Sequence, residues 1–181
     1  MNLSRYFLLA LFAVLLAACN QDKKADESGQ SDANLERLKG LKSDNNTGNI
    51  AAQRSQALSI LDFRLKKDPQ SYAIIEAGVW EYEFVFDGEM SKPGEYAGVW
   101  IDFKPDFTYD YGKNTEVNGS GRYNYHFERG ELLMIDNDSK VKPQEWTAKN
   151  AGDAMVLVGT QTYRDNSVQM KLTRRDDNFR Q

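Results

Sequence analysis

The chain of 181 residues has little of the chemistry that most metal sites and nucleophilic enzymes require. It contains one cysteine and one histidine, which excludes a disulfide framework, zinc clusters of the Cys/His kind and most nucleophile–His pairs. Its 23 basic residues are outnumbered by 27 acidic ones, so the formal charge is −4. An acidic chain without a basic stripe offers no electrostatic surface for nucleic acid. These shortages favour a binding or structural role.

The remaining candidates for catalysis are readily explained without it. His126 alternates with Tyr125 and Phe127, so we expect it at the surface rather than as a general base. Three acids lie around one expected turn, where solvated carboxylates are common: Asp102, Asp106 and Asp110. We therefore expect no enzyme activity, no metal site and no cofactor.

Residues 1–18 have the composition of a signal peptide. Arg5 is their only charged side chain, and the apolar run that follows is too short to span a bilayer as a mature helix. The run ends in Leu16-Ala17-Ala18-Cys19, which resembles the lipobox of bacterial lipoproteins. The resemblance implies cleavage before Cys19 and acylation of that residue. The alternative is a lone buried cysteine behind an ordinary secretory peptide.

A lipidated Cys19 would anchor the protein to a membrane without spanning it. Asn20 follows the cysteine, which resembles the sorting pattern of outer-membrane lipoproteins. We therefore expect a location in the bacterial cell envelope, at the outer membrane, with its periplasmic or surface face left open.

The next two segments differ sharply in composition. Residues 19–47 are rich in Asp, Lys, Ser, Asn, Gln and Gly, and such a segment cannot bury enough apolar surface to order itself. It is predicted to be a tether. Within residues 48–69, apolar side chains recur at helical spacing over 49–67 until Pro69 stops the run. The helix is expected to pack on the domain that follows, with contact to a partner as the alternative.

The remainder, residues 70–181, alternates aromatic and polar residues in short runs divided by Gly, Asn, Asp and Pro. No helical pattern lies between the runs to make parallel crossovers. The spacing predicts an all-β domain with eight antiparallel strands near 77–86, 96–103, 107–111, 122–127, 131–135, 145–149, 154–163 and 167–175.

The expected turns are unequal in length. Residues 104–106, 128–130 and 150–153 make short connections, whereas most alternate connections, such as 87–95 and 112–121, are longer. In an up-and-down meander, alternate loops emerge at opposite ends, so one end is closed and the other forms a mouth. The predicted fold is an eight-stranded antiparallel up-and-down barrel preceded by one α-helix.

At this point the residues resemble the lipocalin superfamily. Gly78-Val79-Trp80 matches the family's Gly-x-Trp motif, although Gly98-Val99-Trp100 matches it too. The resemblance covers about 76–175 and implies that Arg174 packs across Trp80 at the closed end, with the 49–67 helix beneath that end. Because the family's middle Asp-Tyr motif has no convincing match, the chain resembles divergent, bacterial lipocalin-like lipoproteins.

Alternation along the predicted strands places many rings inside the barrel. The expected interior comprises Trp80, Tyr82, Phe84, Phe86, Tyr109, Tyr111, Tyr123, Tyr125, Phe127 and Met170. Phe84, Phe86, Tyr111 and Tyr123 are expected near the mouth. The candidate ligand-binding residues are Tyr82, Phe84, Phe86, Tyr111, Tyr123 and Tyr125, because rings and phenols suit an amphiphile.

Two functions follow from this interior. The barrel either carries or senses a small hydrophobic or amphiphilic ligand, or it is filled by its own side chains and acts as a structural, partner-binding or inhibitory envelope module. A cavity of about 300 Å³ or more favours the ligand.

Overall fold

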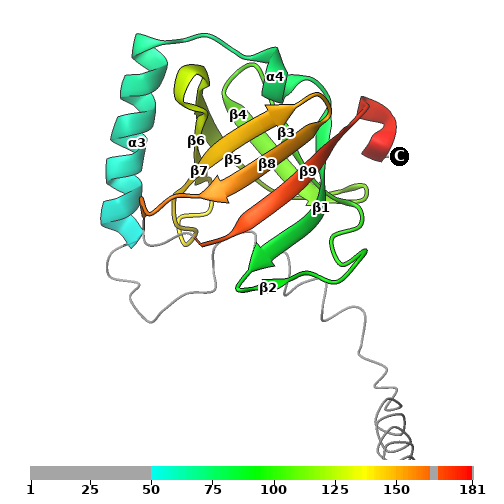
Figure 1. Ribbon diagram of the computed structural model, residues 1–181. Helices are drawn as coiled ribbons and strands as arrows, with labels where there is room; N and C mark the ends of the chain where they lie inside the picture. The colour runs from blue at the N-terminus through cyan, green and yellow to red at the C-terminus, as the bar shows by residue number, and fades with distance from the viewer. Residues whose placement is uncertain (1–49, 164–166, 181) are drawn as a thin grey trace, which may run out of the picture. The chain divides into compact units, whose positions relative to one another are not determined.

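The strands form one antiparallel sheet that closes on itself in the computed structural model, which describes residues 50–163 and 167–180 (Figure 1). The sheet order is β2-β1-β3-β4-β5-β6-β7-β8-β9, and a further pairing of β1 with β9 closes the barrel. The strands are β1 (Val79–Asp87), β2 (Glu89–Met90), β3 (Val99–Phe103), β4 (Thr108–Lys113), β5 (Glu116–His126), β6 (Glu131–Asp136), β7 (Gln144–Ala151), β8 (Ala154–Gly159) and β9 (Gln169–Arg175). The predicted eight-stranded barrel is confirmed, with β2 as a short addition.

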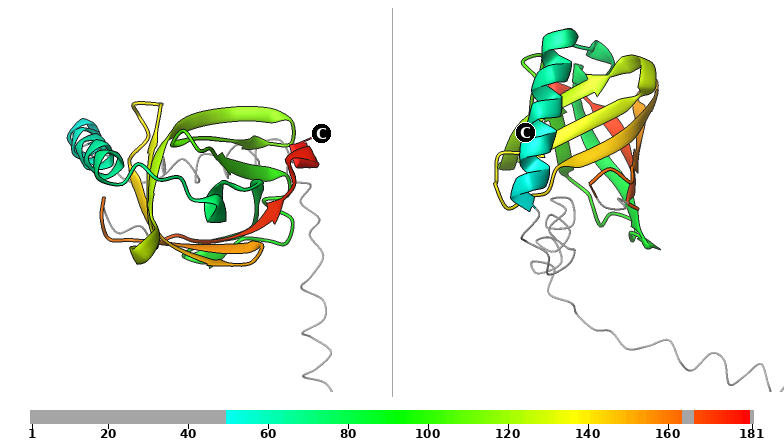
Figure 2. Two further views of the ribbon diagram at one scale, coloured as in Figure 1. Left: turned by 90° about the horizontal axis from the view of Figure 1, so that it is seen from above. Right: turned by 90° about the vertical axis from the view of Figure 1, so that its left-hand side faces the viewer.

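The predicted helix is also present as α3 (Ile50–Lys67). Its buried residues Ala57 and Leu61 pack on Leu133 and Ile135 of β6. These two β6 residues alternate with Leu132, which faces the barrel core, so β6 is buried on both faces. The helix therefore lies along the outside of the barrel wall (Figure 2). The expectation that it sits beneath the closed end is wrong, because its apolar stripe matches the outer face of β6 instead.

Polar side chains fix the docking of α3 at both of its ends. Arg54 donates hydrogen bonds to the backbone carbonyls of Asp136 and Val141, at 2.7 and 2.8 Å. Near the other end, a guanidinium nitrogen of Arg64 lies 3.3 Å from Glu131 and 3.6 Å from Glu145. These contacts set the register of the helix along the wall.

The short helix α4 (Ala73–Glu76) covers the closed end instead (Figures 1 and 2). Ile75 is completely buried and belongs to the barrel core. The Trp80 indole N–H donates to the Ile75 carbonyl at 2.7 Å, and Arg174 donates to the Ile74 carbonyl at 2.8 Å. Trp80 and Arg174, the residues of the expected closing contact, thus bind two adjacent carbonyls of α4.

Trp80 and Arg174 lie directly opposite each other on β1 and β9. The guanidinium carbon of Arg174 is 4.8 Å from the centroid of the Trp80 ring, which is cation–π geometry. Gly78 precedes them with φ of 74°, and a Cβ there would come within 2.4 Å of the Arg175 carbonyl oxygen. The expected structural roles of Gly78, Trp80 and Arg174 therefore have a direct geometric basis.

The expected long connection over 112–121 is wrong. Strands β4 and β5 continue into it and pair as far as Lys113 and Glu116, which leaves a two-residue turn at 114–115. The pattern hides these strand ends because 112–121 is rich in Gly, Asn and Ser, which are weak strand signals. The predicted strand over 154–163 also ends early, at Gly159.

Replacing Trp80 with alanine should destabilise the barrel by about 3–5 kcal/mol, the usual cost of truncating a fully buried Trp. The measurement is the free energy of unfolding in denaturant. Phe63→Ala is the matched control, because Phe63 is 66% exposed, and its loss should stay within about 0.5 kcal/mol. Equal midpoints for wild type and Trp80→Ala would contradict the assigned role of the indole.

Candidate functional site

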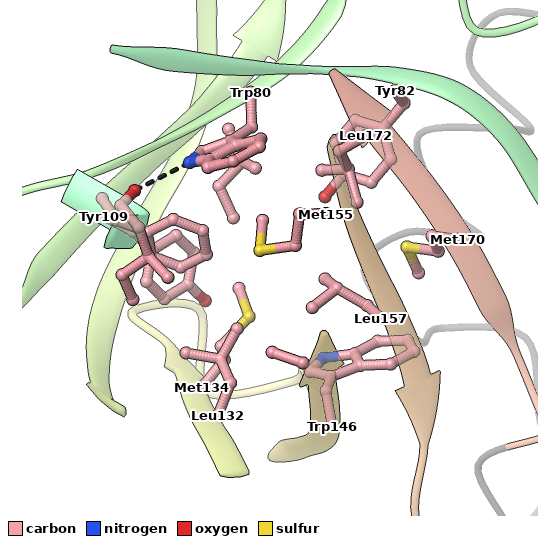
Figure 3. Packing of buried hydrophobic residues seen from close by; sticks show 14 of the residues in the cluster. Trp80, Tyr82, Tyr109, Leu132, Met134, Trp146, Met155, Leu157, Met170 and Leu172 are labelled. Carbon is pink, nitrogen blue, oxygen red and sulfur yellow. Dashed lines mark hydrogen bonds between the residues drawn. The ribbon is translucent and has the colours of Figure 1, made fainter. Parts of the chain in front are cut away.

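The barrel interior, the first candidate site, is occupied by its own side chains. Rings and aliphatic groups from the strands meet at its centre (Figure 3). The aromatic members of this core cluster are Trp80, Tyr82, Tyr96, Phe103, Tyr109, Tyr123, Tyr125 and Trp146. Tyr111 is partly buried and packs against them. The predicted aromatic interior is thus present for most of its members, as a packed core.

The cavity that the structure describes among the core side chains is small. A cavity of about 20 Å³ is lined by residues that include Tyr82, Tyr109, Tyr111 and Met170. That volume is close to what one water molecule needs and far below the 300 Å³ or more of a ligand pocket. Trp146 also lines it, and its buried indole N–H finds no hydrogen-bond partner among the described residues. An ordered water is the occupant that this cavity fits.

Two of the proposed ligand-binding residues do not face the interior. The pairing of β1 with β9 shifts between Tyr82 and Phe84, which marks a bulge at Glu83. Beyond the bulge Val85 is the residue in the core cluster, and its neighbours Phe84 and Phe86 are only half-buried. Alternation counted through a bulge assigns every later residue to the wrong face.

Tyr123 and Phe127 also lie elsewhere than expected. Because β5 begins at Glu116, Tyr123 is deep in the strand and near the closed end. Its hydroxyl donates to Glu76 of α4 at 2.8 Å and lies 2.9 Å from the Lys104 carbonyl. Phe127 is in the 3-10 helix η3 (Phe127–Arg129) and is 52% exposed. Tyr123 therefore does not lie near the mouth, and Phe127 does not lie in the barrel interior.

Burial raises the pKa of the interior tyrosines above the ordinary value of 10. Burial is the largest cause for Tyr82, Tyr109 and Tyr125. For Tyr123, burial is again the first cause, and the hydrogen bond to Glu76 adds to the rise in pKa. The phenols of the core are therefore neutral structural groups at ordinary pH.

The second candidate site is a groove on the outside of the barrel, which we call the α3–η3 groove. Its volume is about 1120 Å³, larger than most small-molecule pockets. One side is the C-terminal half of α3, and the other is the end of β5 with η3. Its lining comprises Gln56, Ser59, Ile60, Phe63, Arg64, Lys67, Asp68, Gln70, Tyr72, Asn124, Tyr125, His126, Phe127, Glu128 and Arg129.

Sequence reasoning missed this groove. Its rims come from segments some sixty residues apart in the chain, so no local pattern joins them. The one available signal was Phe63, which stands off the apolar stripe of the helix and is 66% exposed. His126 was expected at the surface and is half-buried in the groove.

Nothing in the described part of the chain supplies a metal site. Over residues 50–163 and 167–180, no group of three or more His, Cys, Asp or Glu side chains is placed to hold an ion. The acids Asp106 and Asp110 are engaged in turn contacts with Thr108 and Lys104.

No helix of the described region is long and apolar enough to cross a membrane. Cys19 lies outside the described residues.

Comparisons with known proteins assign no family. No protein-family profile matches the chain, and a search of curated proteins finds no match. Among solved structures, a DUF4847 family protein from Bacteroides vulgatus ATCC 8482 is similar with a TM-score of 0.40 and 10% sequence identity. The match covers 57% of this chain and 96% of that one. Similarity at this level establishes no function.

Because burial raises the pKa values of the interior tyrosines, we expect the folded protein to lose stability at alkaline pH. Their pKa values are raised in the folded protein, so the unfolded chain ionises first as pH rises above about 10. The stability they contribute is complete below that pH and is lost as pH climbs towards their folded-state pKa values. We expect phenolate absorbance and unfolding to rise together, and Tyr82→Phe, which keeps the ring, to weaken the pH dependence. Reversible ionisation near pH 10 in the folded state would reveal a solvent-filled interior.

Proposed function

We propose that this protein is a lipid-anchored module of the bacterial cell envelope that binds a protein partner on its outer surface. The observation that supports the proposal is that the cavity described among the core side chains has a volume of about 20 Å³, which is too small for an amphiphile. The barrel acts as a rigid frame, and its external surface performs the function.

The anchor in this proposal is Cys19, with the polar segment behind it as a tether. Two or more acyl chains give stable membrane attachment, whereas one gives only marginal binding. A tethered module of this kind samples partners near the membrane at a raised effective concentration. The proposal includes no catalytic step, and Asp106 and Asp110 make turn contacts with Thr108 and Lys104.

The ligand-carrier function is the alternative that must be tested directly. The chain from residue 20 onward, checked first for cooperative thermal unfolding, is extracted with organic solvent and titrated with fluorescent fatty acids. We expect no stoichiometric co-extracted molecule and no saturable binding, because the core side chains occupy the interior.

Tyr111→Ala and Tyr82→Phe separate the two functions. In a filled barrel, Tyr111→Ala lowers stability without creating or removing a binding isotherm, and Tyr82→Phe leaves the titration unchanged. Saturable binding by wild type that Tyr111→Ala weakens by about 1–3 kcal/mol would establish a carrier and overturn the proposal.

The anchor is tested by Cys19→Ala in a bacterial host. The variant lacks the thiol that receives the lipid, so we expect an uncleaved or soluble precursor without acyl label. Radiolabelled palmitate and membrane fractionation provide the measurement. Normal processing and labelling of Cys19→Ala would contradict lipid anchoring while leaving the barrel's properties unaffected.

A further inference from the structure

Helix α3 packs on the barrel as a separate element. The core cluster described inside the barrel includes no residue of α3. Its buried residues Ala57 and Leu61 form a small cluster of their own with Leu133 and Ile135. The backbone of β6 pairs with β5 on one side and with β7 on the other, so the sheet closes without the helix. Undocking α3 therefore leaves the described strand pairings intact.

One stripe of α3 is complementary to the outer face of β6, which we call the β6 face. The stripe comprises Arg54, Ala57, Leu61 and Arg64. These residues are spaced three, four and three positions apart, so they lie along one side of the helix. The two apolar members in the middle of the stripe meet Leu133 and Ile135.

Polar contacts at both ends of the stripe fix the direction of the helix. Arg54 donates to the carbonyl of Asp136, the last residue of β6, at 2.7 Å. Arg64 lies 3.3 Å from Glu131, the first residue of β6, and 3.6 Å from Glu145. The side chains of these two acids are only 28% and 11% exposed, so an unoccupied β6 face lacks a cation that partly buried carboxylates need. The β6 face thus fits a helix that runs opposite to β6 and carries a cation near its end.

A second copy of the chain supplies a helix with these same contacts. Exchange of an identical element between protomers is a low-cost route to a dimer, because the contacts are the same within one chain and between two. The hinge would be residues 68–72, which connect α3 with α4. Pro69 favours extended backbone at the residue before it. Because Pro69, Gln70 and Ser71 are exposed, this part of the hinge can straighten without uncovering buried side chains of its own.

We propose that α3 is exchanged between two copies of the chain, so that the helix of each copy docks on the β6 face of the other. This inference rests on the proposed partner-binding function and names the partner as a second copy. In the two-fold dimer both helices keep the contacts of the single chain, and the two hinges change conformation. The proposed lipid anchor confines the copies to one membrane, which raises their effective concentration and favours the dimer.

The exchange is measured in the full chain, in mild detergent, as the distance between two spin labels. The labels are attached at Ser55→Cys on α3 and Lys149→Cys on β7, because both side chains are exposed. The labelled chain is mixed with an excess of unlabelled chain and concentrated, and singly labelled chains correct for any label at Cys19. We expect the distance of the docked helix to be replaced in part by a longer one, as labelled helices dock on unlabelled barrels. Unchanged distances after mixing would overturn the exchange.

Deleting residues 69–71 gives a second test, because it shortens the reach of the hinge by about 10 Å. A shortened hinge keeps α3 from the β6 face of its own chain, so we expect a dimer in analytical ultracentrifugation at concentrations where the wild type is mainly monomeric. Adding Leu61→Ala should raise the dissociation constant of this dimer about tenfold or more, because it removes the apolar contact with the β6 face. Phe63→Ala is the matched control, since Phe63 is 66% exposed and lies outside the stripe, and it should change that constant by less than about twofold.

Two results with the deletion variant contradict the exchange. A folded but monomeric variant, whether proteases cleave its α3 or not, shows that the β6 face does not accept the helix of a second copy. A dimer that Leu61→Ala and Phe63→Ala weaken equally is held by another surface. If the deletion variant does not fold, the spin-label distances decide. The fatty-acid titration tests the proposed function separately, so its failure is distinguishable from failure of the exchange.

Discussion

The indole of Trp80 is the contact on which the closed end of the barrel depends. Its N–H holds the Ile75 carbonyl of α4, and its face receives the Arg174 guanidinium from the strand that closes the sheet. Gly78 allows the two chains to approach because no Cβ fits beside the Arg175 carbonyl. One side chain therefore joins the first strand, the last strand and the helix that covers the end.

The large side chains of the core also determine how much open space lies between the strands. Rings that would line a ligand cavity in a wider barrel here contact one another, and the cavity described among them has a volume of about 20 Å³. Because α3 buries the outer face of β6 but leaves Phe63 uncovered, the helix creates a groove at its own edge. Packing thus fills the core with side chains and leaves a groove on the outside of the barrel.

The sequence predicts the helix and the strands better than it predicts which side chains face the core and where the helix packs. Helical spacing locates α3 within one residue, and the Gly-x-Trp motif with Arg174 identifies the closing contact. The bulge at Glu83 leaves no trace in the alternating pattern, so Phe84 and Phe86 were assigned to the wrong face. The groove was beyond prediction because helix spacing reveals an apolar stripe but not which surface that stripe will cover.

The central claim is that the interior is filled by the protein itself. The most direct test is a crystal structure determined under xenon pressure, because xenon enters dry apolar cavities that a packed core does not provide. We predict no xenon inside the barrel and a single ordered water near the Trp146 indole nitrogen. Xenon density, or elongated density of an amphiphile, among Tyr82, Tyr109 and Met170 would contradict the account.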